Sequence, residues 1–107
     1  MARMELTPQE VKAKLDRGDK FVLVDVREPW EVQLVGLREA VRISMEDMPW
    51  RVEELNRDDE VVVFCHTGVR SGMVAQWLRA QGFERVWNLQ GGIDAWAQTV
   101  DPSLRRY

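Results

Sequence analysis

The chain contains one cysteine, Cys65, among its 107 residues, and its neighbours are of types that support nucleophilic chemistry. It is followed by His66-Thr67-Gly68-Val69-Arg70-Ser71, a segment that combines a glycine, two hydroxyls and a permanently charged guanidinium. The thiolate form of cysteine is the nucleophile, and backbone N–H groups and nearby positive charge favour it. The segment therefore predicts a reactive cysteine in a loop that can stabilise an anion.

The elements on either side would position this cysteine. Val61–Phe64 (VVVF) is wholly apolar, which is typical of a strand that is covered on both faces. Helical apolar spacing begins at Ser71 and ends at the stop signal Gly82. Residues 66–70 are therefore expected to form a loop between a strand and a helix, where Gly68 permits unusual backbone conformations. The N-terminus of the following helix adds unpaired N–H groups and the positive end of a dipole.

Two interpretations of Cys65 remain open at this point. It can be a small buried hydrophobic residue that ends a strand, with Arg70 paired to a surface carboxylate. The order strand, cysteine, glycine loop, arginine, helix favours the nucleophile instead. A single cysteine forms no intramolecular disulfide, and a structural zinc site usually needs four ligands, so we expect no metal. A reducing cytoplasm is the expected compartment.

Other segments read as alternating strands and helices. Thr7, Pro8 and Glu10 form a capping box that opens a helix ending at Gly18. Further strands are expected at residues 21–26, 41–43 and 85–89, and further helices at residues 28–34, from Ser44 to about Leu55, and at 93–96. We expect residues 101–107 to be a loosely held terminus.

This alternation predicts the α/β class, with one domain over residues 1–107 (core about 5–98, then a C-terminal tail at 99–107) and a mainly parallel central sheet flanked by helices on both faces. Ligands of such sheets bind beyond the carboxyl ends of the strands, and Cys65 lies at one of these ends. We expect the five Trp residues to pack in the core.

Charge and hydropathy exclude some classes of function. The net charge of −3 is too small to indicate a nucleic-acid partner. No run of about 18 apolar residues predicts a membrane span, and residues 1–10 lack the apolar stretch of a secretory signal. Residues 1–60 hold 15 acidic and 10 basic residues, whereas residues 61–107 hold 3 acidic and 5 basic residues. The half that contains Cys65 is mildly positive, which suits a small anionic substrate.

Three segments resemble motifs of one family. The C-x-x-G-x-R pattern of Cys65, Gly68 and Arg70 resembles the active-site loop of single-domain rhodaneses, which are sulfurtransferases. Asp25-Val26-Arg27-Glu28 is similar to the D-V-R-E segment of that family, and Gly91-Gly92-Ile93-Asp94-Ala95-Trp96 is similar to its G-G-x-x-x-W segment. The chain departs from the family at residues 35–40, where G-H-I-P-G-A is usual and only the apolar Leu37 and Ala40 are kept.

The resemblance implies sulfur transfer without a metal or an organic cofactor. Cys65 would attack the outer sulfur of thiosulfate or a similar small anionic donor, and the resulting persulfide would pass its sulfur to a thiol, cyanide or a partner protein. The resemblance implies that the substrate-binding residues are His66, Thr67, Gly68, Val69 and Arg70. It also implies that Asp25, Arg27 and Ser71 support the loop without binding the substrate themselves.

Two other functions remain possible for a chain with this cysteine loop. Phosphatases and arsenate reductases of the cysteine-loop kind place five residues between the cysteine and the arginine, whereas Cys65 and Arg70 have four between them. A tetrahedral phosphoryl group needs a wider ring of donors than one sulfur atom, so the short loop disfavours them. The other rival is a binding module with a rhodanese fold; such modules often lose the cysteine, which is kept here.

Overall fold

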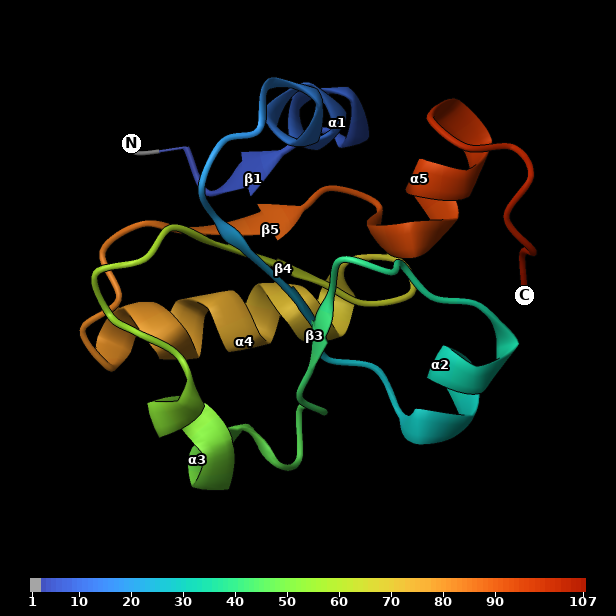
Figure 1. The fold of residues 1–107 in the computed structure, drawn as a ribbon. Helices are drawn as coiled ribbons and strands as arrows, with labels where there is room; N and C mark the ends of the chain where they lie inside the picture. The colour runs from blue at the N-terminus through green and yellow to red at the C-terminus, as the bar shows by residue number, and fades with distance from the viewer. Residues whose placement is uncertain (1–2) are drawn as a thin grey trace.

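Five parallel strands form one sheet in the order β1-β5-β4-β2-β3 (Figure 1). The computed structural model describes residues 3–107, so residues 1 and 2 of the predicted domain lie outside the described residues. The strands are β1 (Glu5–Leu6), β2 (Val22–Asp25), β3 (Val41–Arg42), β4 (Val61–Phe64) and β5 (Val86–Leu89). The central strand β4 pairs with β2 on one side and β5 on the other.

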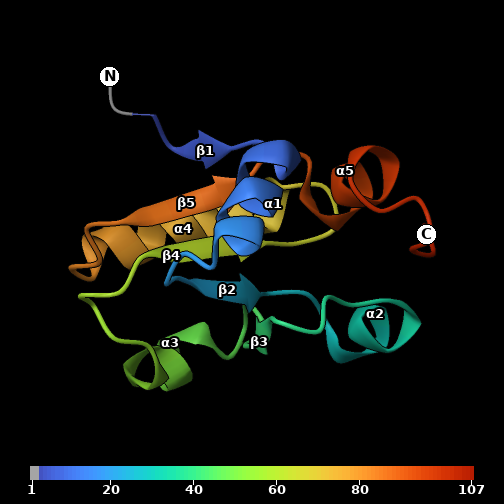
Figure 2. The ribbon, with the colours of Figure 1, turned by 45° about the horizontal axis from the view of Figure 1, so that its top comes forward.

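Helices cover both faces of this sheet (Figures 1 and 2). On one face lie α1 (Pro8–Arg17) and α5 (Gly92–Thr99), and on the other lie α3 (Met48–Arg51) and α4 (Val69–Ala80). The short helix α2 (Pro29–Leu34) follows β2 and lies beyond its carboxyl end. The predicted fold class, with a parallel sheet between two layers of helices, is confirmed.

The pattern of β4 explains this layering. Val61 and Val63 belong to the core cluster under α3 and α4, whereas Val62 and Phe64 belong to the cluster under α1 and α5. All four side chains are fully buried. A strand that is buried on both faces has a continuous run of apolar residues, and this run is why β4 could be predicted from the sequence.

Several predicted boundaries are wrong. Strand β1 was not expected, and α4 begins at Val69 rather than Ser71 because Gly68, with a φ of 104°, turns the chain into the helix two residues earlier. The helix expected from Ser44 to about Leu55 is instead a turn, the short helix α3 and a 3-10 turn at Val52–Glu54. The Ser44 hydroxyl does accept a hydrogen bond from the N–H of Asp47, at 3.3 Å.

The chain after α5 is more ordered than predicted. Residues 101–107 form no helix or strand, yet Leu104 and Tyr107 pack against the core cluster on the α1 and α5 face. The expectation of a loosely held terminus is therefore wrong, since apolar contacts hold this segment. The expectation for tryptophan is wrong in part: Trp96 is buried, but Trp30 and Trp50 are 59% and 84% exposed.

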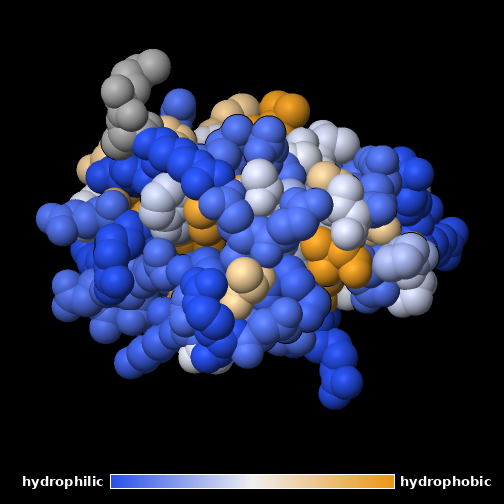
Figure 3. Space-filling view, turned by 90° about the horizontal axis from the view of Figure 1, so that it is seen from above, coloured by the Kyte–Doolittle hydropathy of each residue, from blue (hydrophilic) through white to orange (hydrophobic). Residues whose placement is uncertain are grey.

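The surface over α1 is mainly hydrophilic. Seen from that side, charged and polar side chains cover most of the molecule, and hydrophobic atoms show only in small separate areas between them (Figure 3). Within residues 3–107, no helix is long and apolar enough to cross a membrane. The buried apolar groups are instead gathered in the two clusters on either side of the sheet.

Candidate active site

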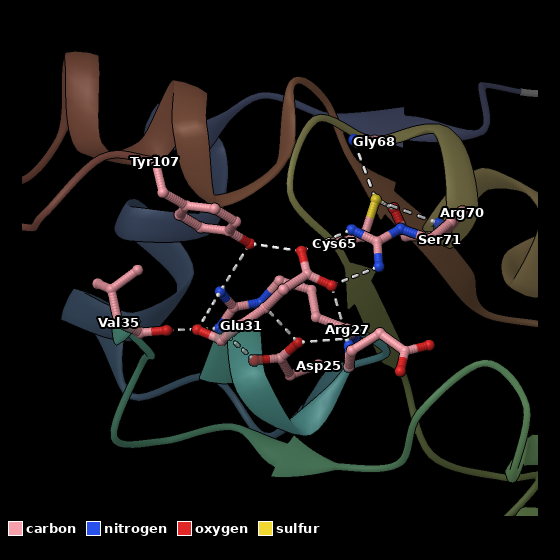
Figure 4. Close-up of polar contacts among 10 residues, drawn as sticks. Asp25, Arg27, Glu31, Val35, Cys65, Gly68, Arg70, Ser71 and Tyr107 are labelled. Carbon is pink, nitrogen blue, oxygen red and sulfur yellow. Dashed lines mark hydrogen bonds and ion pairs between the residues drawn. The ribbon is translucent and has the colours of Figure 1, made fainter. Parts of the chain in front are cut away.

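Cys65 lies directly after β4, with its side chain buried and three hydrogen bonds directed at its sulfur. The N–H of Gly68 lies 3.1 Å from Sγ, the N–H of Ser71 lies 3.4 Å away and the Ser71 hydroxyl lies 3.3 Å away (Figure 4). These groups belong to the turn that enters α4 and to the first turn of that helix. The predicted position of the cysteine, between a strand end and a helix N-terminus, is what the structure has.

These contacts set the acidity of the thiol. Burial alone raises the pKa of Cys65, because a thiolate loses hydration inside the protein. Hydrogen bonds from the hydroxyl and N–H of Ser71 and from the N–H of Gly68, together with the nearby N–H of Thr67, outweigh that effect and bring the pKa below its usual value. The site therefore favours the nucleophilic form of the sulfur.

A close approach of α5 holds the loop from its other side. The N–H groups of Ile93 and Asp94 donate to the carbonyls of Cys65 and His66, at 2.9 and 3.0 Å. Gly92 makes this possible, since a Cβ at that position would lie 2.5 Å from both carbonyl oxygens. The G-G-x-x-x-W segment thus supports the cysteine loop through its backbone.

Asn88 of β5 supports the same loop and was not predicted from the sequence. Its Oδ1 accepts from the Ser71 hydroxyl at 2.6 Å, and its Nδ2 donates to the carbonyl of Gly68 at 3.0 Å. Asn88 therefore holds both residues whose groups donate to Sγ. A polar residue inside the otherwise apolar strand Val86–Leu89 was the signal that could have identified it.

Arg70 is engaged by a carboxylate that sequence reasoning also missed. Its guanidinium donates to both carboxylate oxygens of Glu31, at 2.6 and 2.8 Å, and it points across the mouth of the loop toward Cys65 (Figure 4). Glu31 lies on α2 and is buried. Arg70 holds the pKa of Glu31 down at about 2. Arg70 thus pairs with a buried acid and not with a surface one.

Asp25 and Arg27 form a buried ion pair at the end of β2. Arg27 donates to both oxygens of Asp25, at 3.0 and 2.7 Å, and also to the Val35 carbonyl and the Tyr107 hydroxyl. Neither residue contacts the sulfur of Cys65. Their connection to the loop runs through Tyr107 and Glu31 (Figure 4), and their role in ordering the loop stays a prediction.

The remaining loop side chains are arranged differently from one another. The side chains of Val69, which is 70% exposed, and of Thr67 point to solvent, so these two residues belong to the loop through their backbones. The His66 ring stacks on the Tyr107 ring at a centroid distance of 3.9 Å. Its buried Nε2 makes no hydrogen bond to any residue between 3 and 107. Substrate contacts of residues 66–70 stay a prediction.

The described residues also limit the cofactor chemistry that can be built from side chains. Between residues 3 and 107, no group of three or more His, Cys, Asp and Glu side chains is placed to hold a metal ion. The groups that meet at the site are instead one thiol, three hydrogen-bond donors and a paired guanidinium. This arrangement can activate a sulfur nucleophile and stabilise negative charge on it.

Known proteins are similar to this chain in sequence and in fold. The sequence model of one protein family, the rhodanese-like domain, matches residues 7–99. A putative sulfurtransferase of Bacillus subtilis (YtwF) is 38% identical over 98 residues, which cover 92% of this chain and 94% of that protein. The thiosulfate sulfurtransferase GlpE of Vibrio cholerae is 38% identical over 74 residues, 69% of this chain and 70% of that protein.

A solved structure agrees with these matches. The crystal structure of a rhodanese-like domain protein from Staphylococcus aureus superimposes with a TM-score of 0.84 at 30% identity, covering 97% of this chain and 98% of that one. The cysteine loop and the two supporting segments lie within the matched residues. The chain therefore belongs to the rhodanese-like domain family.

Proposed function

We propose that this chain is a sulfurtransferase that carries sulfane sulfur as a persulfide on Cys65. The observation that carries the proposal is the convergence of three hydrogen-bond donors on one buried sulfur atom with a lowered pKa. The curated relatives include proteins named as sulfurtransferases, which supports the same class of reaction.

The proposed first half-reaction consumes a donor such as thiosulfate. The Cys65 thiolate attacks the outer sulfur of thiosulfate, the sulfur–sulfur bond of the donor breaks, and sulfite leaves with that electron pair. A persulfide anion remains on Cys65. In the proposed step, the N–H groups of Gly68 and Ser71, which point at Sγ of the thiolate, stabilise the outer sulfur of this anion.

The second half-reaction returns the enzyme to its starting state. A thiolate or cyanide attacks the outer sulfur of the persulfide, and the Cys65 thiolate leaves. The donors that lower its pKa also make it a better leaving group, so one arrangement serves both halves. The acceptor is a thiol or a partner protein, and a reducing cytoplasm is the compartment that we propose, since Cys65 must stay a free thiol.

The geometry supports sulfur transfer over phosphate chemistry. The donors around Cys65 converge on one sulfur atom, and the Arg70 guanidinium already gives two hydrogen bonds to Glu31. A dianionic phosphoryl group would have to compete with that buried carboxylate for the same guanidinium. The retained cysteine, with its lowered pKa, supports catalysis over a binding role.

A turnover assay tests this proposal. Wild-type protein should convert thiosulfate and cyanide to thiocyanate, and Cys65→Ser should fold normally without doing so. Thiocyanate formation that survives in Cys65→Ser would refute the mechanism. Hydrolysis of an aryl phosphate by the wild type that is lost in Cys65→Ser would instead establish the phosphatase.

A further inference from the structure

Tyr107 contacts His66 at the start of the cysteine loop and Glu31, the partner of Arg70 at its far end, although it lies 41 positions after His66 and belongs to no helix or strand. Its ring and its hydroxyl make separate contacts, and neither touches Sγ. The C-terminal segment that carries Tyr107 packs against the core, which holds the backbone of this residue in place.

The ring contacts the start of the loop. It lies flat on the His66 imidazole, with the two planes 9° apart and the centroids separated by 3.9 Å. His66 directly follows the nucleophile, and its carbonyl accepts the N–H of Asp94. Tyr107 and α5 together hold His66 by its ring and by its backbone.

The hydroxyl contacts the far end of the loop through Glu31. It donates to Oε2 of Glu31 at 2.7 Å and accepts from Nη1 of Arg27 at 3.0 Å (Figure 4). Glu31 in turn holds Arg70 with both carboxylate oxygens. Burial raises the pKa of Tyr107 to about 12, so its hydroxyl keeps the proton that it donates.

We propose that Tyr107 is a positioning residue of this site, which fixes the cysteine loop by stacking on His66 and by holding the Glu31 carboxylate that anchors Arg70. The N–H groups that stabilise the sulfur act over distances of 3.1 to 3.4 Å, so small displacements of the loop weaken them. The proposal rests on the proposed function for its effect on sulfur transfer, but its effect on the Cys65 thiol stands independently.

Two substitutions separate the ring from the hydroxyl. Tyr107→Phe removes the hydrogen bonds to Glu31 and Arg27 and keeps the stack on His66, whereas Tyr107→Leu removes both. Arg105→Ala is the matched control, since Arg105 is an exposed residue of the same C-terminal segment, two positions before Tyr107. Melting temperatures show that each variant is folded under assay conditions.

The readout is the pKa of the Cys65 thiol, from the pH dependence of its alkylation rate, together with kcat and KM for thiosulfate. We expect Tyr107→Phe to raise this pKa by about half a unit and to lower kcat roughly threefold, because the N–H donors align less well with the sulfur. Tyr107→Leu should produce larger changes in the same direction. Arg105→Ala should leave the thiol pKa at the wild-type value.

A double-mutant cycle tests the route through Arg70. In an Arg70→Ala background, adding Tyr107→Phe should change the thiol pKa by less than half as much as in the wild type, because the hydroxyl acts through the Glu31–Arg70 pair. Wild-type thiol pKa and kcat in both Tyr107 variants would overturn the proposal. Changes of the same size in Arg105→Ala would also overturn it. An effect of Tyr107→Phe on the thiol pKa that is undiminished in the Arg70→Ala background would do so too.

The two proposals fail separately. A wild-type protein that takes no sulfur from thiosulfate would refute the proposed function, while the alkylation data would still decide the role of Tyr107. Normal sulfur transfer with no effect of either Tyr107 variant would refute only the role of Tyr107.

Discussion

The reactivity of Cys65 depends on a balance between burial, which disfavours a thiolate, and the hydrogen bonds that favour it. Two of those bonds come from Ser71, through its N–H and through its hydroxyl. The hydroxyl carries one hydrogen and lies within hydrogen-bond distance of both Sγ and Oδ1 of Asn88, so it donates to one of these atoms at a time. Ser71 is therefore the residue whose side chain bears most directly on the pKa of the thiol.

Ser71→Ala should raise the pKa of the Cys65 thiol and slow its alkylation at neutral pH, because one donor to the thiolate is lost. The pH dependence of the iodoacetamide reaction measures this directly. Thr67→Ala is the matched control: the Thr67 side chain is exposed, and its N–H is retained. Equal pKa values in wild type and Ser71→Ala would show that the hydroxyl does not stabilise the thiolate.

Arg70→Ala should lower the free energy of unfolding by about 1–3 kcal/mol, because the buried carboxylate of Glu31 loses a bidentate partner. If Arg70 serves to hold the loop in place through Glu31 and does not bind the donor, the rates of sulfur transfer from charged and uncharged donors should fall by similar factors. Arg70→Lys should recover part of the stability, since it keeps the charge without the planar fork. Parallel kinetics with both donors and urea unfolding make the comparison. A loss confined to dianionic thiosulfate, with unchanged stability, would establish Arg70 as an anion ligand instead.

At the level of whole elements, the sequence predicted what depends on local pattern. Strands β2, β4 and β5 were found within one or two residues because burial on both faces makes them continuous apolar runs. Strand β1, with only two residues, carries no such signal. The start of α4 depends on the positive φ of Gly68, which a pattern of apolar residues does not report.

The supporting residues of the site show where sequence reasoning ends. Cys65 and its loop were identified because strand, glycine and helix signals adjoin them in the chain. Glu31, Asn88 and Tyr107 reach the loop from α2, β5 and the C-terminal segment, and only tertiary packing brings them there. No local pattern in one sequence encodes which distant side chains will meet.

The contact between α5 and the loop gives a prediction at this scale. Gly92→Ala should destabilise the protein by about 2 kcal/mol or more, because a Cβ would lie 2.5 Å from two carbonyl oxygens and the residue has a φ of +63°. It should also slow sulfur transfer, since Cys65 and His66 carry those carbonyls.

Gly18→Ala is the matched control for Gly92→Ala. Its φ is +73°, yet a Cβ there would meet nothing within 4 Å, so this variant reports the cost of the backbone conformation alone. Thermal melts of the two variants measure the difference. Equal losses of stability in Gly92→Ala and Gly18→Ala would mean that the close contact between α5 and the carbonyls of the loop does not constrain residue 92.

At the scale of the whole molecule, the Glu31 pair links stability to pH. The folded protein lowers the pKa of Glu31 from 4.5 to about 2, chiefly through the hydrogen bonds from Arg70. A carboxyl whose pKa is depressed by folding stabilises the protein fully above the unfolded pKa. This contribution should therefore be present above about pH 4.5 and be lost as the pH falls toward 2.

Glu31→Gln should remove that dependence. The variant should be less stable than the wild type at pH 7, and the difference should shrink as the pH falls from 4.5 toward 2, as measured by urea midpoints across this range. Glu39→Gln is the control, because Glu39 is an exposed glutamate on the surface, where a carboxylate contributes little to stability. A constant difference between wild type and Glu31→Gln at all pH values would contradict the linkage.

The central claim is that Cys65 carries sulfur, and the intact mass of the protein tests it most directly. After incubation with thiosulfate and removal of small molecules, the wild type should gain the mass of one sulfur atom, and cyanide should remove it with release of thiocyanate. Cys65→Ser should gain nothing under the same conditions. An unchanged mass of the wild type, or the same gain in Cys65→Ser, would contradict the account.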